Sequence, residues 1–292
     1  RGPRDGGRSM DASELASALE LAKEAALAAG ELIRSGFDKS RAETAVEHKG
    51  AVDLVTEVDK ACEDLIIARI KATFPDHALI GEETSSAAGA TPELTDAPTW
   101  MVDPLDGTTN FVHRFPFSCV CIGLVVNREP VVGVVHNPIL GETFTAVKGC
   151  GAELNGKPIS VSDTAELGQA LLGTECGVSR DAETMRCLFG RMQAATSQMR
   201  SVRCSGSCAM QMVGVACGRL DAFYEIGFGG PWDCCAAAVV VKEAGGEVLD
   251  PEGGPFNLMG RRVLVANGKL GAAVAGVLKT VGSAAAEPQP SS

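Results

Sequence analysis

The 292-residue sequence has few positive charges, no long apolar run and no paired metal-binding cysteines. None of its apolar runs reaches the roughly 20 residues that a membrane-spanning helix needs. Lysine and arginine number 26 against 37 aspartates and glutamates, so the formal net charge is -11 at pH 7. Proteins that bind nucleic acid or an anionic membrane need a basic face. We therefore expect no nucleic-acid partner and no membrane partner.

The eleven cysteines are scattered through apolar segments. No Cys-x-x-Cys pair is followed by another at zinc-finger spacing, which argues against a structural zinc site. The pattern instead predicts reduced and mostly buried thiols in a reducing compartment. We expect a cytoplasmic protein, or a plastid protein if the basic residues at the N-terminus remain from a targeting segment.

The two ends of the chain differ in composition from the rest. Residues 1–11 open with a basic, glycine-rich stretch and are expected to be a disordered leader or a tag remnant. Residues 283–292 are rich in alanine, proline and serine, which predicts a disordered tail. Between them, residues 12–282 have a suitable length for a single domain with two α/β halves, about 12–150 and 151–282.

Hydrophobic periodicity predicts a mixture of helices and short strands in blocks. Apolar residues at helical spacing predict helices at 12–37, 56–74, 182–196, 208–216 and 232–244. Short apolar runs predict strands at 78–81, 99–102, 118–126, 131–136, 170–174, 222–225 and 263–266. Blocks of this kind, without a strict βαβ repeat, indicate layered α/β sheets with mixed strand directions.

The most informative segment follows the predicted strand at 99–102. An apolar run leads into Asp103, Pro104 removes a ladder donor, and Asp106-Gly107 turns the chain. Two carboxylates three residues apart on such a turn can converge on one point, and the carbonyl of Leu105 can join them. Hard divalent cations favour a set of oxygen ligands that includes two anions. The alternative is an ordinary turn, in which the aspartates bond only to nearby backbone amides.

Two further segments contribute carboxylates. Glu82 and Glu83 follow the end of a predicted strand, and Asp233 lies near the predicted start of a helix. Asp233 could also serve only as the N-cap of that helix. The histidines His113 and His136 lie beside strands, and we expect them to be structural.

Together these motifs resemble the inositol monophosphatase family. Gly81-Glu82-Glu83, the segment 103–111, and Trp232-Asp233 with the segment 243–246 occur in the family's order, and the likeness covers about residues 15–278. The glycine-rich segments 205–208, 214–219 and 227–232 most resemble plant-type enzymes that act on inositol and L-galactose phosphates. In the animal-type pattern a histidine precedes the tryptophan, whereas this chain has a longer turn with Gly229-Gly230.

The resemblance implies a five-layer αβαβα sandwich that is usually a homodimer. It implies magnesium-dependent, lithium-sensitive hydrolysis of a small cyclitol or sugar monophosphate, with two or three Mg²⁺ ions as cofactors. A first ion would be held by Glu82, Asp103 and the carbonyl of Leu105. A second would share Asp103 and add Asp106 and Asp233.

The resemblance also implies roles in binding and in activating water. Gly107 and Thr108 would offer backbone N–H groups to the phosphate, and Lys49 would lie on the same side. Asp59, Thr108 and Glu82 would place or deprotonate the attacking water. The remaining substrate contacts implied are Gly206, Ser207, Cys208, Glu225 and Asp233.

Several alternatives stay open. Fructose 1,6-bisphosphatases and 3'-phosphonucleotide phosphatases share the Asp-x-x-Asp-Gly core, but they usually show Ser-Ser or Thr-Lys where this chain has Thr108-Thr109. Histidinol phosphate and a 3'(2'),5'-bisphosphate nucleotide are alternative substrates. A catalytically inactive scaffold is a further alternative, against which stands the presence of every carboxylate of the implied metal set.

Overall fold

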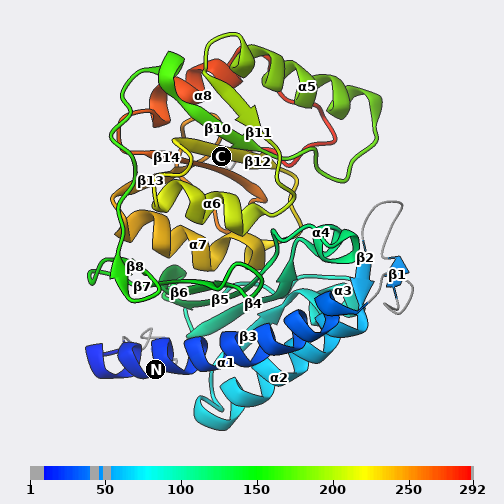
Figure 1. Cartoon of the computed structure of the whole chain (residues 1–292), viewed down its shortest axis with the longest axis vertical. Coiled ribbons are helices and arrows are strands. Elements are labelled where there is room, and N and C mark those ends of the chain that lie inside the picture. The colour runs from blue at the N-terminus through cyan, green and yellow to red at the C-terminus, as the bar shows by residue number, and fades with distance from the viewer. Residues whose placement is uncertain (1–9, 40–45, 49–53, 291–292) are drawn as a thin grey trace, which may run out of the picture.

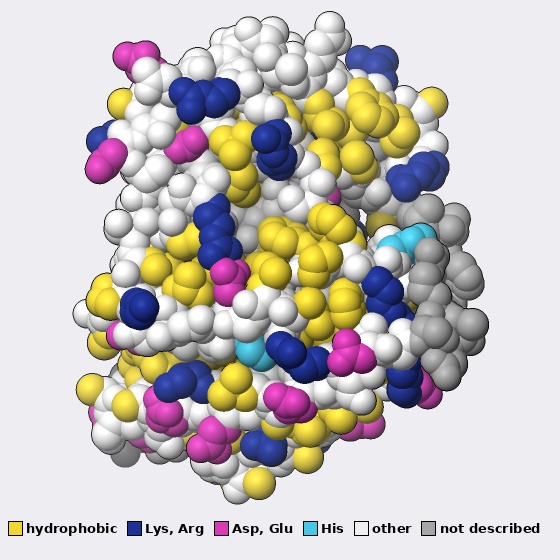
Figure 2. Space-filling view, viewed as in Figure 1, with side chains coloured by type: hydrophobic (Ala, Val, Ile, Leu, Met, Phe, Trp, Pro, Cys, Tyr) yellow, Lys and Arg dark blue, Asp and Glu magenta, His cyan; other side chains and the backbone are white. Residues whose placement is uncertain are grey.

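The structure is a computed structural model that describes residues 10–39, 46–48 and 54–290. Figure 1 shows five layers: α1 and α2, a seven-stranded sheet, α6 and α7, a five-stranded sheet, and α5 with α8. The predicted αβαβα sandwich is confirmed. On the face shown in Figure 2, basic side chains are scattered among acidic and apolar ones and form no continuous patch.

The first half holds the larger sheet, in the order β3-β4-β5-β6-β7-β8-β9, and a separate β1-β2 pair. Its elements are α1 (Ala12–Asp38), β1 (Val46–His48), β2 (Leu54–Thr56), α2 (Glu57–Thr73), β3 (Ala78–Gly81), α3 (Glu82–Ala88), β4 (Thr99–Asp106), α4 (Thr108–His113), β5 (Cys119–Val126), β6 (Glu129–Asn137), β7 (Glu142–Val147), β8 (Ala152–Leu154) and β9 (Lys157–Pro158).

The second half holds the smaller sheet, in the order β11-β10-β12-β14-β13. Its elements are the 3₁₀ helix η2 (Leu167–Gln169), β10 (Leu171–Thr174), α5 (Ala182–Thr196), β11 (Ser201–Arg203), α6 (Cys208–Ala216), β12 (Ala222–Ile226), α7 (Pro231–Glu243), β13 (Gly246–Leu249), β14 (Arg262–Asn267) and α8 (Gly271–Lys279). Among the described residues no helix is both long and apolar enough to cross a membrane.

Strand β4 continues past the point where the sequence predicts its end. It pairs with β5 from Thr99 to Asp106, and the register shifts between Asp103 and Asp106. A bulge of this kind tolerates Pro104, which cannot donate to the ladder. The predicted turn at 103–106 is therefore wrong: both aspartates belong to the end of a strand. The chain turns only at Gly107, whose φ of 87° favours glycine.

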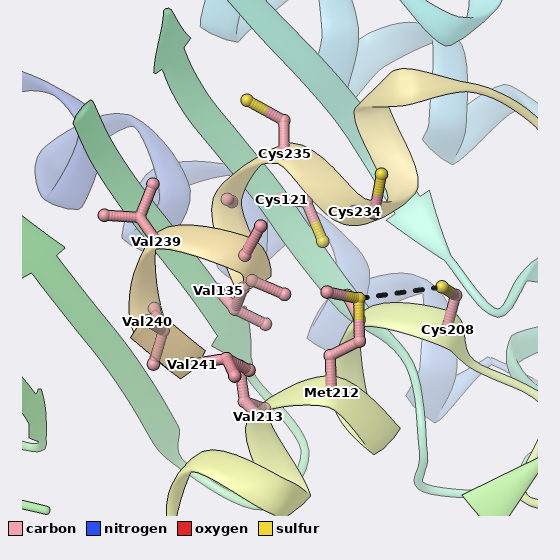
Figure 3. Close-up of a cluster of buried hydrophobic side chains, with 14 of the residues drawn as sticks. Cys121, Val135, Cys208, Met212, Val213, Cys234, Cys235, Val239, Val240 and Val241 are labelled. Atoms are coloured by element: carbon pink, nitrogen blue, oxygen red, sulfur yellow. Dashed lines mark hydrogen bonds between the residues drawn. The ribbon is translucent and has the colours of Figure 1, made fainter. Parts of the chain in front are cut away.

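Helices α6 and α7 pack between the two sheets in a core rich in small and sulfur-containing side chains (Figure 3). Nearly all of α7 is buried, from Pro231 to Val241. All eleven cysteines are free, and most are buried, as the sequence predicts. Burial raises the pKa of the Cys208 and Cys234 thiols well above the usual value, so both are neutral.

Gly133 on β6 lies directly beneath α7, where a Cβ would be 2.1 Å from the Ala236 carbonyl oxygen. We expect Gly133→Ala to lower the free energy of unfolding by roughly 3 kcal/mol or more, because backbone must move to relieve the clash. Gly276→Ala is the matched control: a Cβ there meets nothing within 4 Å, and alanine favours the helix. Urea unfolding of both variants measures the difference, and equal stabilities would contradict this packing.

Both chain ends need correction. Residues 1–9 lie outside the described residues, but Asp11 belongs to the fold, since its carboxylate accepts the N–H groups of Ser13 and Glu14 and caps α1. The predicted disordered tail is wrong for residues 283–290. Arg191 donates to both carboxylate oxygens of Glu287 at 2.7 Å, and both side chains are buried. Composition alone does not show that a glutamate in such a segment has a buried arginine as partner.

Candidate active site

The predicted metal ligands come from three elements that meet between the two sheets. Strands β3 and β4 are parallel neighbours with Gly81 opposite Val102, so Glu82, which follows the end of β3, is placed beside Asp103 of β4. Asp106 ends β4, and Asp233 lies in the first turn of α7. These four side chains and Leu105 line one cleft of about 680 Å³.

Hydrogen bonds hold two of these carboxylates in place. Asp106 Oδ2 accepts from Ser207 Oγ at 2.6 Å and from Ala209 N at 2.8 Å, which ties β4 to the start of α6. Asp233 Oδ2 accepts from Gly229 N at 2.9 Å. Asp233 is thus not the N-cap of α7, a position that Gly230 occupies. Instead it fixes the turn that precedes the helix.

The cluster is electrostatically unbalanced without a cation. Burial raises the pKa of Asp103 well above its usual value, and the charges of Glu82, Asp106 and Asp233 raise it further. Burial and the neighbouring carboxylates also raise the pKa of Asp233 well above its usual value. Several carboxylate oxygens around open space are the donor set that hard divalent cations prefer. The residues present therefore fit a divalent-cation site.

Sulfur atoms lie behind this cluster. The thiols of Cys119 and Cys121 and one Asp106 oxygen all lie within 4.8 Å of one another. Burial raises the pKa of both thiols, so they are protonated, and neither residue lines the cleft. A soft-metal site would need thiolates, so only the oxygen ligands on the cleft side suit a cation.

Asp59 lies behind Thr108 and outside the lining of the cleft. The Thr108 hydroxyl is 3.1 Å from Asp59 Oδ1 and 3.0 Å from the Leu105 carbonyl oxygen. Burial raises the pKa of Asp59 to about 6, although hydrogen bonds from Thr56 and Thr108 oppose the shift. The arrangement lets a proton pass from the cleft through the Thr108 hydroxyl to a buried carboxylate.

Six of the predicted substrate contacts line the same cleft as the carboxylate cluster. They are Gly107, Thr108, Gly206, Ser207, Cys208 and Glu225. Burial, together with the charges of Glu175 and Asp106, raises the pKa of Glu225 well above its usual value. Glu225 Oε2 is buried and has no hydrogen-bond partner among the described residues, so it is available to a ligand. Lys49 lies outside the described residues.

Sequence reasoning missed three charged residues that line the cleft: Glu175, Arg180 and Arg261. Glu175 accepts the N–H groups of Ser205 and Gly206 at 3.1 and 2.7 Å. Arg261 donates to the carbonyl oxygens of Phe228 and Gly227 and so fixes the turn before α7. All three lie on loops far from the motifs, so no local pattern marks them.

Comparisons with known proteins agree with this geometry. The model of the inositol monophosphatase family matches residues 14–283. Inositol monophosphatase 3 of Solanum lycopersicum is 58% identical over 252 residues, 86% of this chain and 92% of the relative. Inositol monophosphatase 1 of Homo sapiens is 46% identical over 220 residues, 75% of this chain and 79% of the relative. The solved inositol monophosphatase from Anabaena aligns with a TM-score of 0.78 at 34% identity, covering 91% of this chain and 97% of that one.

A layered α/β fold with an acidic, oxygen-lined cleft between its sheets defines a class of phosphatase. The chain belongs to the inositol monophosphatase family. It is a phosphatase, and its substrate is a phosphate monoester.

Proposed function

We propose that this phosphatase hydrolyses both myo-inositol 1-phosphate and L-galactose 1-phosphate, with Mg²⁺ as its cofactor. The observation that carries the proposal is the pairing, in one cleft, of a carboxylate cluster with the buried, unpartnered Oε2 of Glu225. The first suits a cation that binds phosphate, and the second suits a substrate rich in hydroxyl groups. The names of the plant and human relatives support an inositol monophosphate as substrate.

Cations held by Glu82, Asp103, Asp106, Asp233 and the Leu105 carbonyl would neutralise charge on the attacking and leaving oxygens and lower the pKa of water.

The protein's own groups position the reactants. The Thr108 hydroxyl accepts the proton of the attacking water as it passes its own proton to the Asp59 carboxylate, to which it is hydrogen-bonded. The backbone of Gly107 and Thr108 lines the cleft where the phosphate would bind. We expect direct attack of water on the phosphorus, without a covalent phosphoenzyme.

Two features of the substrate side of the cleft suit both kinds of ring, a cyclitol and a pyranose. Glu225 can accept hydrogen bonds from ring hydroxyls, which a cyclitol and a pyranose present in similar positions. The turn before α7 is made of glycines, and a Cβ on Gly230 would lie 2.5 Å from the Trp232 ring. Gly230 must therefore remain without a side chain. Gly229 lines the cleft, and a Cβ there would lie 3.2 Å from Asp233 Oδ2, so its lack of a side chain keeps the space beside that carboxylate free.

We expect Glu225→Gln to lower kcat/KM for both substrates by about 10- to 100-fold, because a buried contact to a hydroxyl loses its charge-assisted partner. Glu243→Gln is the control: that carboxylate accepts two backbone N–H groups, from Gly149 and Gly151, and lies outside the cleft. Phosphate release with Mg²⁺ measures both variants. L-galactose 1-phosphate left intact by the wild type, or unchanged values for Glu225→Gln, would overturn the assignment.

The same assay separates the alternatives. Preferred hydrolysis of histidinol phosphate or of a 3'(2'),5'-bisphosphate nucleotide would replace the proposed substrates. Binding of phosphate esters without turnover would indicate a scaffold. The homodimer and the cytoplasmic or plastid location stay predictions.

A further inference from the structure

A second cavity lies beside the cleft in the second half of the molecule. Its volume is about 150 Å³, and it is enclosed by residues 174–179, helix α5, the end of β12 and residues 286–288. It shares Glu175, Cys176, Gly177, Val178, Gly227 and Arg261 with the cleft. These shared residues border the substrate side of the cleft and include none of the predicted metal ligands. A molecule in this side cavity would therefore touch the wall that the substrate also uses.

Most of the side cavity has an apolar wall. The apolar lining residues are Val178, Leu188, Ile226, Ala286 and Pro288. An apolar cavity of about this volume can hold a ring the size of benzene. The side cavity therefore suits a ligand with an apolar body of about six to nine non-hydrogen atoms.

Two buried hydroxyls in this wall have no hydrogen-bond partner among the described residues. They are Tyr224 OH on β12 and Thr184 Oγ1 on α5. The Tyr224 side chain is only 3% exposed. Burial raises the pKa of Tyr224 to about 12, so the phenol keeps its proton, although the hydrogen-bonding effect of the Thr174 side chain opposes the shift. Buried hydroxyls are nearly always paired, and two unpaired ones in one cavity point to a polar group that is supplied from outside.

The charged side chains around the side cavity already have hydrogen-bond partners, and Glu175 accepts the backbone N–H groups of Ser205 and Gly206. Arg191 donates to both oxygens of Glu287 and to the Gly282 carbonyl oxygen, each at 2.7 Å. Arg261 is bonded to backbone carbonyls of the turn at 227–228. An ionic ligand would have to compete with these contacts in a buried setting, where an uncompensated charge is costly.

We propose that the side cavity is a binding site for a small uncharged molecule with an apolar ring or chain and a hydroxyl group, and that its occupancy changes substrate binding. The hydroxyl pairs with Tyr224 OH and Thr184 Oγ1, and the apolar body fills the space beside Leu188 and Ile226. Because the shared wall lies on the substrate side, occupancy changes KM and leaves kcat unchanged. Residues 286–288 close the site and are held there by the Arg191–Glu287 ion pair.

The test uses the full chain with cyclohexanol as the probe and cyclohexanecarboxylate as the charged comparison. Calorimetry is expected to show binding of cyclohexanol and none of the carboxylate. Tyr224→Phe should weaken cyclohexanol binding by about fivefold to tenfold, since one hydrogen bond is lost. The ligand-free variant should melt no lower than the wild type, because the removed hydroxyl has no partner to lose. Thr184→Val should behave in the same way, and Thr196→Val is its control on the exposed side of α5.

Leu188→Trp gives an independent check, because it fills the side cavity from a partly exposed helix position. It should abolish cyclohexanol binding while the protein stays folded. Saturating cyclohexanol should change KM of the wild type at least twofold, by reciprocity between the two ligands. Absence of binding to the wild type, or a KM that does not move, overturns the proposal. So does a Tyr224→Phe variant that melts at a lower temperature, which would mean that ordered water satisfies the hydroxyls. Binding is measured without turnover, so its outcome is separate from the choice of substrate.

Discussion

Asp106→Asn is expected to lower kcat by roughly 100-fold or more while the protein stays folded. The amide keeps an oxygen that can accept from Ser207 Oγ and Ala209 N, so the link between β4 and α6 survives. What it loses is the negative charge that faces the cleft beside Asp103 and Asp233. A cation held by fewer anions binds more weakly and neutralises the phosphate at a higher metal concentration.

Asp221→Asn is the matched control for this experiment. Asp221 is as buried as Asp106, at 8% against 9% exposed, and also accepts from a serine hydroxyl and a backbone N–H. It lies outside the cleft, so its variant should keep kcat near the wild-type value. Phosphate release over a magnesium titration and a thermal melt give both readouts. An Asp106→Asn enzyme with normal turnover at low magnesium would show that this carboxylate holds no cation.

The elements that the sequence predicts well have strong local signals. The helices at 182–196 and 208–216 have the predicted bounds, because an N-capping Asp181 or Ser207 precedes each and the apolar spacing is clear. Helix α8 and strand β7 are not among the predicted elements. α8 is a short run of small residues, and β7 mixes polar and apolar side chains. Their structure depends on contacts with other helices and strands, which a short stretch of sequence does not reveal.

The residues of the candidate site also fall into two groups: those that a sequence motif marks and those that only the fold brings to the cleft. The carboxylates at 82, 103, 106 and 233 belong to recognisable motifs, and their convergence follows from the parallel β3–β4 pair and the first turn of α7. Glu175 and Arg261 belong to no motif and reach the cleft only because β10 ends and β14 begins beside it. The end of β4 is a mixed case: the sequence identifies its aspartates, but the bulge that carries Pro104 depends on pairing with β5.

The carboxylate cluster lowers the free energy of unfolding of the protein when no metal is bound. Six acidic side chains line the cleft. Burial disfavours the charged forms of Asp103, Asp106 and Asp233, and neighbouring carboxylates add to this effect at Asp103 and Asp233. Elsewhere the fold pairs a buried carboxylate with a cation, as Asp250 is paired with Arg262 at 2.8 Å. The carboxylate cluster thus lowers the stability of the metal-free protein, and a bound cation restores that stability.

Asp103→Asn should therefore make the metal-free protein more stable, by about 1–2 kcal/mol, because it removes a carboxylate whose charged form is disfavoured by burial and by its acidic neighbours. The variant keeps the bond from Leu105 N through its amide oxygen. Saturating Mg²⁺ should stabilise the wild type by about 2–3 kcal/mol through linkage and the variant by far less, since a shared ligand is gone.

Asp250→Asn is a control for Asp103→Asn, with an expected effect on stability in the opposite direction. It is also a buried aspartate, but its loss leaves Arg262 without its main partner, so the protein should be destabilised equally with and without Mg²⁺. Chemical unfolding in chelator and in Mg²⁺ measures all three proteins. Two results would contradict this account: Asp103→Asn lowers stability in chelator, or Mg²⁺ stabilises the variant as much as the wild type. In either case a bound cation does not act by relieving repulsion within the cluster. Asp103 would then be a structural residue, and the metal site would have to be built from Glu82, Asp106 and Asp233 alone.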